Sequence, residues 1–247
     1  MSVSSIIFRA YWVFTGASFL SSLSLASVNG YSIAVDSTWF NGSRSTRQDD
    51  NDFRGQSEPR QVKLHFACCP RTHVITAALV LDRDSDDGNQ LPELLDTSAR
   101  NRAIHEVLAD KGYSEVENLE KIASIGALAF ISFPERKPPK DGKPSRPNPS
   151  AIWRAALLCY NSHREYFLKF YHQRSNAETV VSMLIDNNLG CVPGKRTPPT
   201  LRSKNVTAMK NEVYCMVICH NIWCTINSIY EHGNEVNLLS QHLAEAE

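Results

Sequence analysis

Short apolar runs separated by polar turns dominate the chain before residue 82, a pattern typical of strands. Residues 31–36 (YSIAVD) form an apolar run, and residues 61–69 (QVKLHFACC) alternate between the two faces of a strand. A third apolar run, 74–81, follows the short turn at 70–73. Because so short a connection requires an antiparallel hairpin, we predict three neighbouring strands, with the first paired to the second.

Helical and strand patterns alternate in the next segment. Residues 91–95 begin a short helix with proline in its first turn, and a brief apolar run, 107–110, ends in Asp. Ser114 and Glu117 have the spacing of a capping box at the start of another helix, and residues 127–133 return to a strand pattern. A strand that is reached through a helical crossover runs parallel to its neighbour, so we expect the 107–110 strand to lie parallel to the first strand.

The remainder of the chain has mainly helical periodicity. Residues 149–188 place aromatic and aliphatic side chains at helical spacing, and residues 206–230 predict one long amphipathic helix. Two basic loops that contain proline, 134–149 and 191–205, separate these segments. The whole pattern predicts an α/β fold, in which a mixed sheet is flanked by helices and followed by an extended C-terminal helical part.

Charge is balanced over the whole chain but not along it. The 247 residues carry 26 Lys plus Arg and 26 Asp plus Glu, so net charge indicates no partner. Residues 132–210 nevertheless hold 14 basic and 5 acidic side chains, whereas residues 36–97 hold 11 acidic and 7 basic ones. A positive block beside an acidic one fits a polyanion-binding face next to a carboxylate cluster, and an unevenly charged solvated surface is the alternative.

Cysteine usage and the first residues bear on the compartment. The seven cysteines include no C-x2-C pair, which disfavours a structural zinc site and favours reduced thiols in the cytosol. Residues 5–28 are apolar and serine-rich with Arg9 as their one charge, and they fit neither a signal peptide nor a membrane span well. A secreted protein with a signal peptide in its first 27 residues is the hypothesis from another class.

Three acids stand out as candidates for chemistry. Asp36 and Asp110 each end an apolar run that predicts a strand, the place where α/β sheets carry their active groups. Glu178 lies on a predicted helix. Carboxylates supply the hard oxygen ligands that divalent cations need, although any single acid at a strand end is more often a cap or turn residue.

The residues around these acids resemble the catalytic domain of bacterial and archaeal insertion-sequence DDE transposases. The matching segments are Ala34-Val35-Asp36-Ser37-Thr38, Leu108-Ala109-Asp110-Lys111-Gly112-Tyr113, the Y-x2-R-x3-E pattern of Tyr171, Arg174 and Glu178, and the downstream Leu201-Arg202-Ser203-Lys204, Asn211-Glu212 and His220-Asn221. The resemblance covers roughly residues 31–230, preceded by an apolar segment, 1–30, without a recognisable DNA-end-binding domain and followed by an acidic tail, 231–247.

The resemblance implies a ribonuclease-H-like fold on which Asp36, Asp110 and Glu178 form a metal-binding catalytic triad. It implies two Mg²⁺ or Mn²⁺ ions and metal-dependent DNA strand cleavage and strand transfer. The expected partners are DNA, as transposon ends and target, and a second copy in the DNA complex. The resemblance implies no membrane, and a cytoplasmic protein associated with chromosomal DNA.

Ten residues are expected to contact DNA, all of them basic except one tyrosine. They are Lys111, Tyr171, Arg174, Arg136, Lys137, Lys140, Lys195, Arg196, Arg202 and Lys204. Two roles are open for Arg174: a bidentate contact to a DNA phosphate, or a salt bridge that ties down Glu178 or Asp110.

Several departures from the family pattern leave activity open. The family's basic residue seven positions after its Glu falls on Ile185 here, so we expect Ile185→Lys to tighten DNA binding unless Ile185 packs in the core. Asp86 and Asp87 either support the metal site or lie in a solvated loop, and His220 either meets a metal or DNA or is structural. The alternative function is a truncated, inactive transposase remnant that retains DNA binding.

Overall fold

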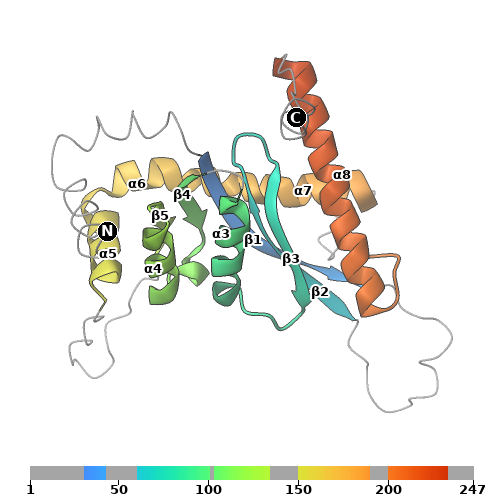
Figure 1. Cartoon of the computed structure of the whole chain (residues 1–247), viewed down its shortest axis with the longest axis horizontal. Helices are drawn as coiled ribbons and strands as arrows, with labels where there is room; N and C mark the ends of the chain where they lie inside the picture. The colour runs from blue at the N-terminus through green and yellow to red at the C-terminus, as the bar shows by residue number, and fades with distance from the viewer. Residues whose placement is uncertain (1–30, 43–59, 101–102, 134–149, 190–199, 233–247) are drawn as a thin grey trace, which may run out of the picture.

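The computed structural model describes residues 31–42, 60–100, 103–133, 150–189 and 200–232. Within these ranges, the chain forms one sheet and a set of helices (Figure 1). The strands are β1 (Tyr31–Asn41), β2 (Gln61–Cys68), β3 (Ile75–Asp82), β4 (Ile104–Ala109) and β5 (Leu128–Ile131). The α-helices are α3 (Leu91–Ala99), α4 (Val116–Ser124), α5 (Ala151–Ser162), α6 (Arg164–Tyr171), α7 (Ser175–Leu189) and α8 (Val206–His232). Three short 3-10 helices are η1 (Gly88–Gln90), η2 (Lys111–Tyr113) and η3 (His172–Arg174).

The sheet has the mixed topology that the sequence predicts. Its strand order is β3-β2-β1-β4-β5. β1 and β2 are antiparallel, as are β2 and β3, whereas β4 runs parallel to both β1 and β5. The predicted hairpin, the pairing of the first two strands and the parallel crossover to β4 are all confirmed. The sheet, its flanking helices and the run α5–α8 confirm the predicted ribonuclease-H-like α/β class and its extended C-terminal helical part.

The first strand is longer than the sequence indicates. We predicted that it ends at Asp36, but β1 continues to Asn41 because β2 pairs with it along this whole extension. Pairing with β4 stops earlier, at Val35 opposite Ala109. The buried Phe40 anchors the extension in the core. Asp36 therefore lies where the parallel neighbour of β1 ends, and not where β1 itself ends.

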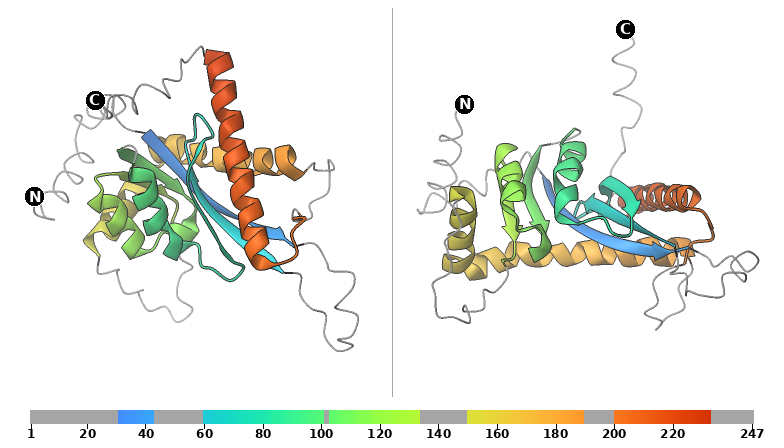
Figure 2. Two further views of the ribbon diagram at one scale, coloured as in Figure 1. Left: turned by 45° about the vertical axis from the view of Figure 1, so that its right-hand side comes forward. Right: turned by 90° about the horizontal axis from the view of Figure 1, so that it is seen from below.

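Alternation along the strands divides the interior into two cores. One core joins Ala34 and Phe66 to α7 and the first half of α8, through side chains such as Val180 and Val213. The other core lies on the opposite face of the sheet, where Ile33, Val35 and Ala67 pack with α3, α4 and Trp153 of α5. Figure 2 shows this layering, with α6 and α7 on one side of the sheet and α3 and α4 on the other. Asp36 belongs to the face covered by α7, since its register partner is Phe66.

One predicted local signal is wrong. Ser114 and Glu117 do not form a capping box, because the residue that precedes α4 is Glu115. The Ser114 hydroxyl instead donates to the Lys111 carbonyl, 2.7 Å away, and closes η2. A short 3-10 turn between β4 and α4 thus uses the serine that the sequence pattern assigned to the helix.

Helix α8 closes the free edge of the sheet at β3. The Ile75 N–H donates to Asn221 Oδ1, and Asn221 Nδ2 donates to the Ile75 carbonyl, both at 2.8 Å. The Val80 N–H donates to the Tyr214 hydroxyl at 3.1 Å. His220 Nε2 lies 2.9 Å from the carbonyl oxygen of His73, so this buried histidine has a structural partner. Side chains of α8 therefore occupy backbone groups that an open edge strand would offer to another chain.

No helix among the residues described above combines the length and the apolar character needed to cross a membrane.

We expect Asn221→Ala to lower the free energy of unfolding by about 2 kcal/mol, because it leaves the N–H and C=O of a buried residue without partners. Asn211→Ala is the matched control, since Asn211 is exposed on the same helix and loses the same amide. Urea denaturation of the two variants measures the difference. Equal losses of stability would show that the bonds to Ile75 contribute nothing measurable.

Candidate active site

The three candidate acids come from three elements around the end of β4. Asp36 lies on β1, and Asp110 directly follows β4, one residue beyond the last pairing of the two strands. Glu178 lies in the first turn of α7, the helix that covers the Asp36 face of the sheet. The parallel pairing of β1 and β4 therefore places Asp36 and Asp110 at neighbouring positions, and helix packing adds Glu178 from the side.

Arg174 connects two of these acids. Its Nη2 lies 2.8 Å from Glu178 Oε1, and its Nη1 lies 3.9 Å from Asp36 Oδ2. The guanidinium also lies over the ring of Tyr171, 5.8 Å from its centroid. Of the two roles left open for Arg174, the structure shows a salt bridge, with Glu178 as predicted and with Asp36 in place of Asp110. Formation of η3 between α6 and α7 sets this arrangement, since Arg174 ends that turn.

Tyr171 lies at the end of α6 and contacts the sheet through its hydroxyl. The hydroxyl donates to Ser132 Oγ at 3.2 Å, just beyond β5. Its ring packs against the core on the α7 face. Tyr171 thus connects the helix before Glu178 to the sheet that carries Asp36.

The electrostatics of Asp36 reflect all three acids. Burial raises the pKa of Asp36 above its ordinary value, and the negative charges of Glu178 and Asp110 raise it further. A hydrogen bond from the Ser37 N–H, at 2.9 Å, and the charge of Arg174 act in the opposite direction. Asp36 therefore interacts with both other carboxylates, and the cation of Arg174 offsets their effect on it.

Carboxylates are the right donors for a hard divalent cation such as Mg²⁺. Among the residues that the structure describes, however, no three His, Cys, Asp or Glu side chains are grouped closely enough to hold a metal ion. Glu178 is paired with Arg174, and Asp110 accepts a hydrogen bond from the Lys111 N–H at 2.7 Å. Asp36 thus interacts electrostatically with the other two acids, but the three carboxylates of this described region do not converge on one position for a metal ion. Their role as a metal-binding triad stays a prediction.

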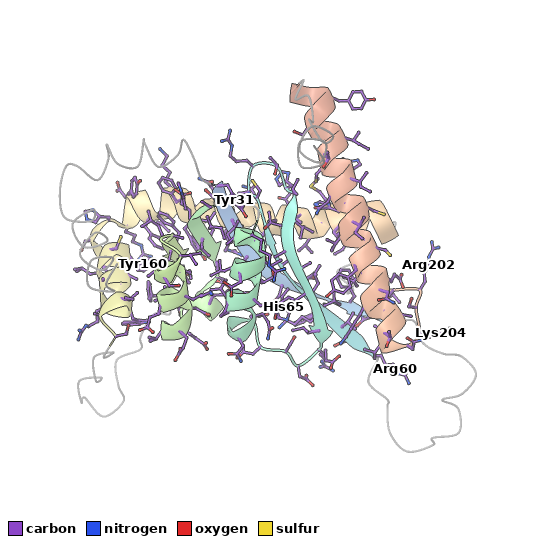
Figure 3. All side chains as sticks on the ribbon, viewed as in Figure 1. Tyr31, Arg60, His65, Tyr160, Arg202 and Lys204 are labelled. Carbon is purple, nitrogen blue, oxygen red and sulfur yellow. The ribbon has the colours of Figure 1, made fainter. Side chains whose placement is uncertain are left out.

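Besides Tyr171 and Arg174, eight residues are expected to contact DNA, and the structure describes three of them. Lys111 is exposed directly after Asp110, and Arg202 and Lys204 are exposed shortly before α8. The other five, Arg136, Lys137, Lys140, Lys195 and Arg196, lie outside the described residues. Arg60 lies beside Lys204, since its Nη1 donates to the Lys204 carbonyl at 3.1 Å (Figure 3). No sequence motif pointed to Arg60, which is distant from Lys204 along the chain.

Asp87 lies on the other face of the sheet and has basic partners of its own. Its Oδ1 is 2.8 Å from Lys63 Nζ and 3.1 Å from Nδ1 of the fully buried His65. Burial alone would raise the pKa of Asp87, but hydrogen bonds with His65, Lys63 and Ser37 outweigh it and hold the pKa well below its usual range. Burial and then the charge of Asp87 raise the pKa of Tyr113, whose hydroxyl is also buried here. Asp87 is therefore a partner of Lys63 and His65 on the opposite face of the sheet and is not grouped with the three acids.

The structure gives Asp86 a role in a local turn and Ile185 a role in core packing. Asp86 Oδ1 accepts a hydrogen bond from the Gly88 N–H at 3.3 Å, which makes it a turn residue. Ile185 is partly buried against the core on the α7 face, so core packing explains the apolar side chain. The expectation that Ile185 presents a face to DNA phosphate is not supported by this position.

Comparison with known proteins gives the family. The family described as "Transposase DDE domain" matches residues 30–191, more than half of the chain. The chain therefore belongs to this family, which confirms the resemblance to DDE transposases.

A solved structure similar to this chain is titled "Cryo-EM structure of piggyBac transposase synaptic complex with hairpin DNA". The two are 12% identical with a TM-score of 0.46, and the similarity covers 93% of this chain and 55% of that one. The chain thus spans little more than half the length of that transposase. No match is found among curated proteins.

The first prediction from this site concerns pH. Because the pKa of Asp87 is lower in the folded than in the unfolded chain, its contribution is fully present above the unfolded value of about 4 and is lost as the pH falls below it. We expect Asp87→Asn to lower stability at pH 7 and to flatten the loss of stability between about pH 4 and 2. Urea denaturation across this range measures both. Asp84→Asn, at an exposed position in the same loop, should leave the profile unchanged, and identical profiles for the two variants would contradict the ion pairs.

The second prediction from this site concerns the side chain of Ile185. We expect Ile185→Lys to lower the free energy of unfolding by about 1.5 kcal/mol, because a partly buried aliphatic side chain is lost from the core. DNA affinity should equal that of Ser182→Lys, a control that adds the same charge at an exposed position of α7. Urea denaturation and a fluorescence binding titration measure the two quantities. Unchanged stability together with tighter binding than the control would instead place Ile185 on a DNA-facing surface.

Proposed function

We propose that this protein is a transposase that catalyses metal-dependent cleavage and strand transfer of DNA, with Asp36, Asp110 and Glu178 as its metal-binding carboxylates. The observation that carries the proposal is the electrostatic coupling of Asp36 to both other acids within a domain of the transposase family. Bound Mg²⁺ or Mn²⁺, as a pair of ions, supplies activation of the attacking oxygen and stabilisation of the leaving oxygen in an in-line displacement.

The residues of the chain have distinct tasks in this proposal. Asp36 is held on the central strand and Asp110 on its parallel neighbour, so that two ligands sit on rigid elements of the sheet. Arg174 holds the carboxylates of Asp36 and Glu178 near each other and offsets their charge. Tyr171 fixes the start of the Glu178 segment through its bond to Ser132. Together these contacts keep three acids near one another that would otherwise repel.

DNA is the proposed partner, as transposon ends and target, and two copies act together in the DNA complex. Lys111 lies beside the acids, where a phosphate near the cut would be neutralised. The cluster of Arg60, Arg202 and Lys204 offers a second contact. Phosphate neutralisation of this kind tolerates many sequences and weakens steeply with salt.

A second candidate function is an inactive transposase remnant that binds DNA. It is favoured by one specific observation: the Glu178 carboxylate, a metal ligand in the proposed active transposase, is paired with Arg174 at 2.8 Å. Cleavage assays distinguish the two, because DNA binding is common to both.

We expect the full chain with Mg²⁺ or Mn²⁺ to nick or cleave DNA that carries the sequence flanking its own gene. Asp36→Asn and Glu178→Gln should each reduce the rate by about 100-fold or more, because each removes a charged ligand, and chelation of the metal should abolish it. Asp186→Asn is the matched control, since Asp186 is an exposed acid on the same helix as Glu178. Gel electrophoresis of labelled DNA measures all four proteins.

Binding is measured in parallel by raising salt from about 50 to 200 mM, over which affinity should fall by about tenfold or more. Salt-sensitive binding without any cleavage would favour the inactive remnant. Equally fast cleavage by Asp36→Asn would contradict the assignment of the triad. A DNA affinity that does not change with salt would contradict the assigned DNA contacts.

A further inference from the structure

Between residues 213 and 230, the outer side of α8 is apolar and carries no charge. Its inner side packs into the core through residues such as Val213 and Met216. On the outer side, Ile218 is 59% exposed, Ile222 54% and Ile226 45%. From 213 to 230 the helix contains no Asp, Glu, Lys or Arg. Soluble monomers rarely leave an apolar patch of this continuity uncovered.

These side chains form a regular row along the helix. Tyr214, Ile218, Ile222, Ile226 and Tyr230 are spaced four residues apart, and all five are exposed. Side chains at this spacing form a ridge on a helix surface, and a groove lies beside it. A second ridge runs alongside, formed by Cys215, Cys219 and Trp223, which are also exposed. The two ridges and the groove between them define the α8 row.

The α8 row is symmetric about its middle residue. Ile218 and Ile226 lie four residues on either side of Ile222, and Tyr214 and Tyr230 lie eight residues on either side. A two-fold axis requires this property, because residue i of one copy must meet residue j of the other, and j must meet i. Antiparallel helices that cross at Ile222 therefore match isoleucine with isoleucine along the central three positions.

We propose that two copies of this chain form a dimer in the absence of DNA, by antiparallel packing of their α8 rows about a two-fold axis at Ile222. The ridge of each helix inserts beside the ridge of the other, and ridges at four-residue spacing pack with the helices crossing at about 50°. Absence of charge means that no like-charged pair is brought together on the axis. The C-terminal half of α8 extends beyond the sheet (Figure 1).

The area fits a second copy. The exposed parts of the three isoleucines, Trp223 and Tyr230 amount to on the order of 600 Å² per copy, compared with about 800 Å² per partner in a standard interface. Dimerisation through α8 does not depend on cleavage, since no candidate acid lies on this helix face. Failure of the dimer would leave the proposed function intact, and failure of cleavage would leave the dimer intact.

The first experiment is sedimentation equilibrium of the full chain without DNA. Wild type should be dimeric at micromolar concentration. Ile222→Glu should raise the dissociation constant at least 100-fold, because the two-fold axis brings the introduced carboxylates together. Leu158→Glu is the matched control, since Leu158 is also 54% exposed but lies on α5, and it should leave the dissociation constant unchanged. Thermal unfolding of each variant confirms that the monomer remains folded.

The second experiment tests the register. Antiparallel packing about Ile222 places position 218 of one copy against position 226 of the other. Ile218→Lys and Ile226→Glu should each weaken the dimer, and the double variant should bind at least tenfold more tightly than either single one, because opposite charges then meet. Parallel packing would set each position against itself and give no recovery.

Three results would overturn the proposal. One is a wild type that stays monomeric at all concentrations. Another is a dimer that survives Ile222→Glu, which would place the interface elsewhere. The third is a monomeric wild type in which Ile222→Glu, but not Leu158→Glu, lowers the unfolding temperature, which would show that another segment of the same chain covers the α8 row.

Discussion

The double pairing of β1 determines how the rest of the structure is arranged. This strand has an antiparallel neighbour along nearly its whole length and a parallel neighbour along only its first half. The hairpin β2–β3 needs the first of these pairings, and the crossover through α3 needs the second. Where the parallel neighbour stops, the sheet opens beside Asp36, and this opening is the place where a third acid can approach from α7. The candidate site is thus a consequence of unequal strand lengths at the centre of the sheet.

Two consecutive residues at this point are held from opposite faces. Asp36 points toward α7 and is paired with Arg174, whereas Ser37 faces the other core, on the side of Asp87. Asp87 is fixed in turn by Lys63 and His65 on β2. Polar networks on both faces of a sheet are costly to bury unless their members are satisfied by one another. On the Asp87 face, Lys63 and His65 are the partners that offset the charge of this carboxylate.

Much of the fold follows from patterns that are local in sequence. Residues 61–69 and 74–81 have strand patterns joined by a short turn, so they can pair only as an antiparallel hairpin. The strand at 107–110 follows a helix, and this crossover predicts parallel pairing with the first strand. The length of β1 was not predictable, because residues 37–41 mix polar and aromatic side chains and gain their strand conformation from β2. The capping pattern at Ser114 failed because a 3-10 turn competes for the same hydroxyl. At the site, the motif identified the acids, but the partner of Arg174 and the pairing of Lys63 with Asp87 depend on side-chain directions in three dimensions.

Helix α8 covers the edge of β3 and so blocks pairing of this strand with another extended chain. Asn221 and Tyr214 occupy hydrogen-bonding groups of β3 that would otherwise be free. A polypeptide that ended before residue 206, through a premature stop or proteolysis, would lose both these bonds and the buried side chains of α8, and would expose β3 as an open template. Such a product would add strands from other copies at this edge and assemble into cross-β polymers. The last helix is therefore as much a barrier against misassembly as a part of the domain.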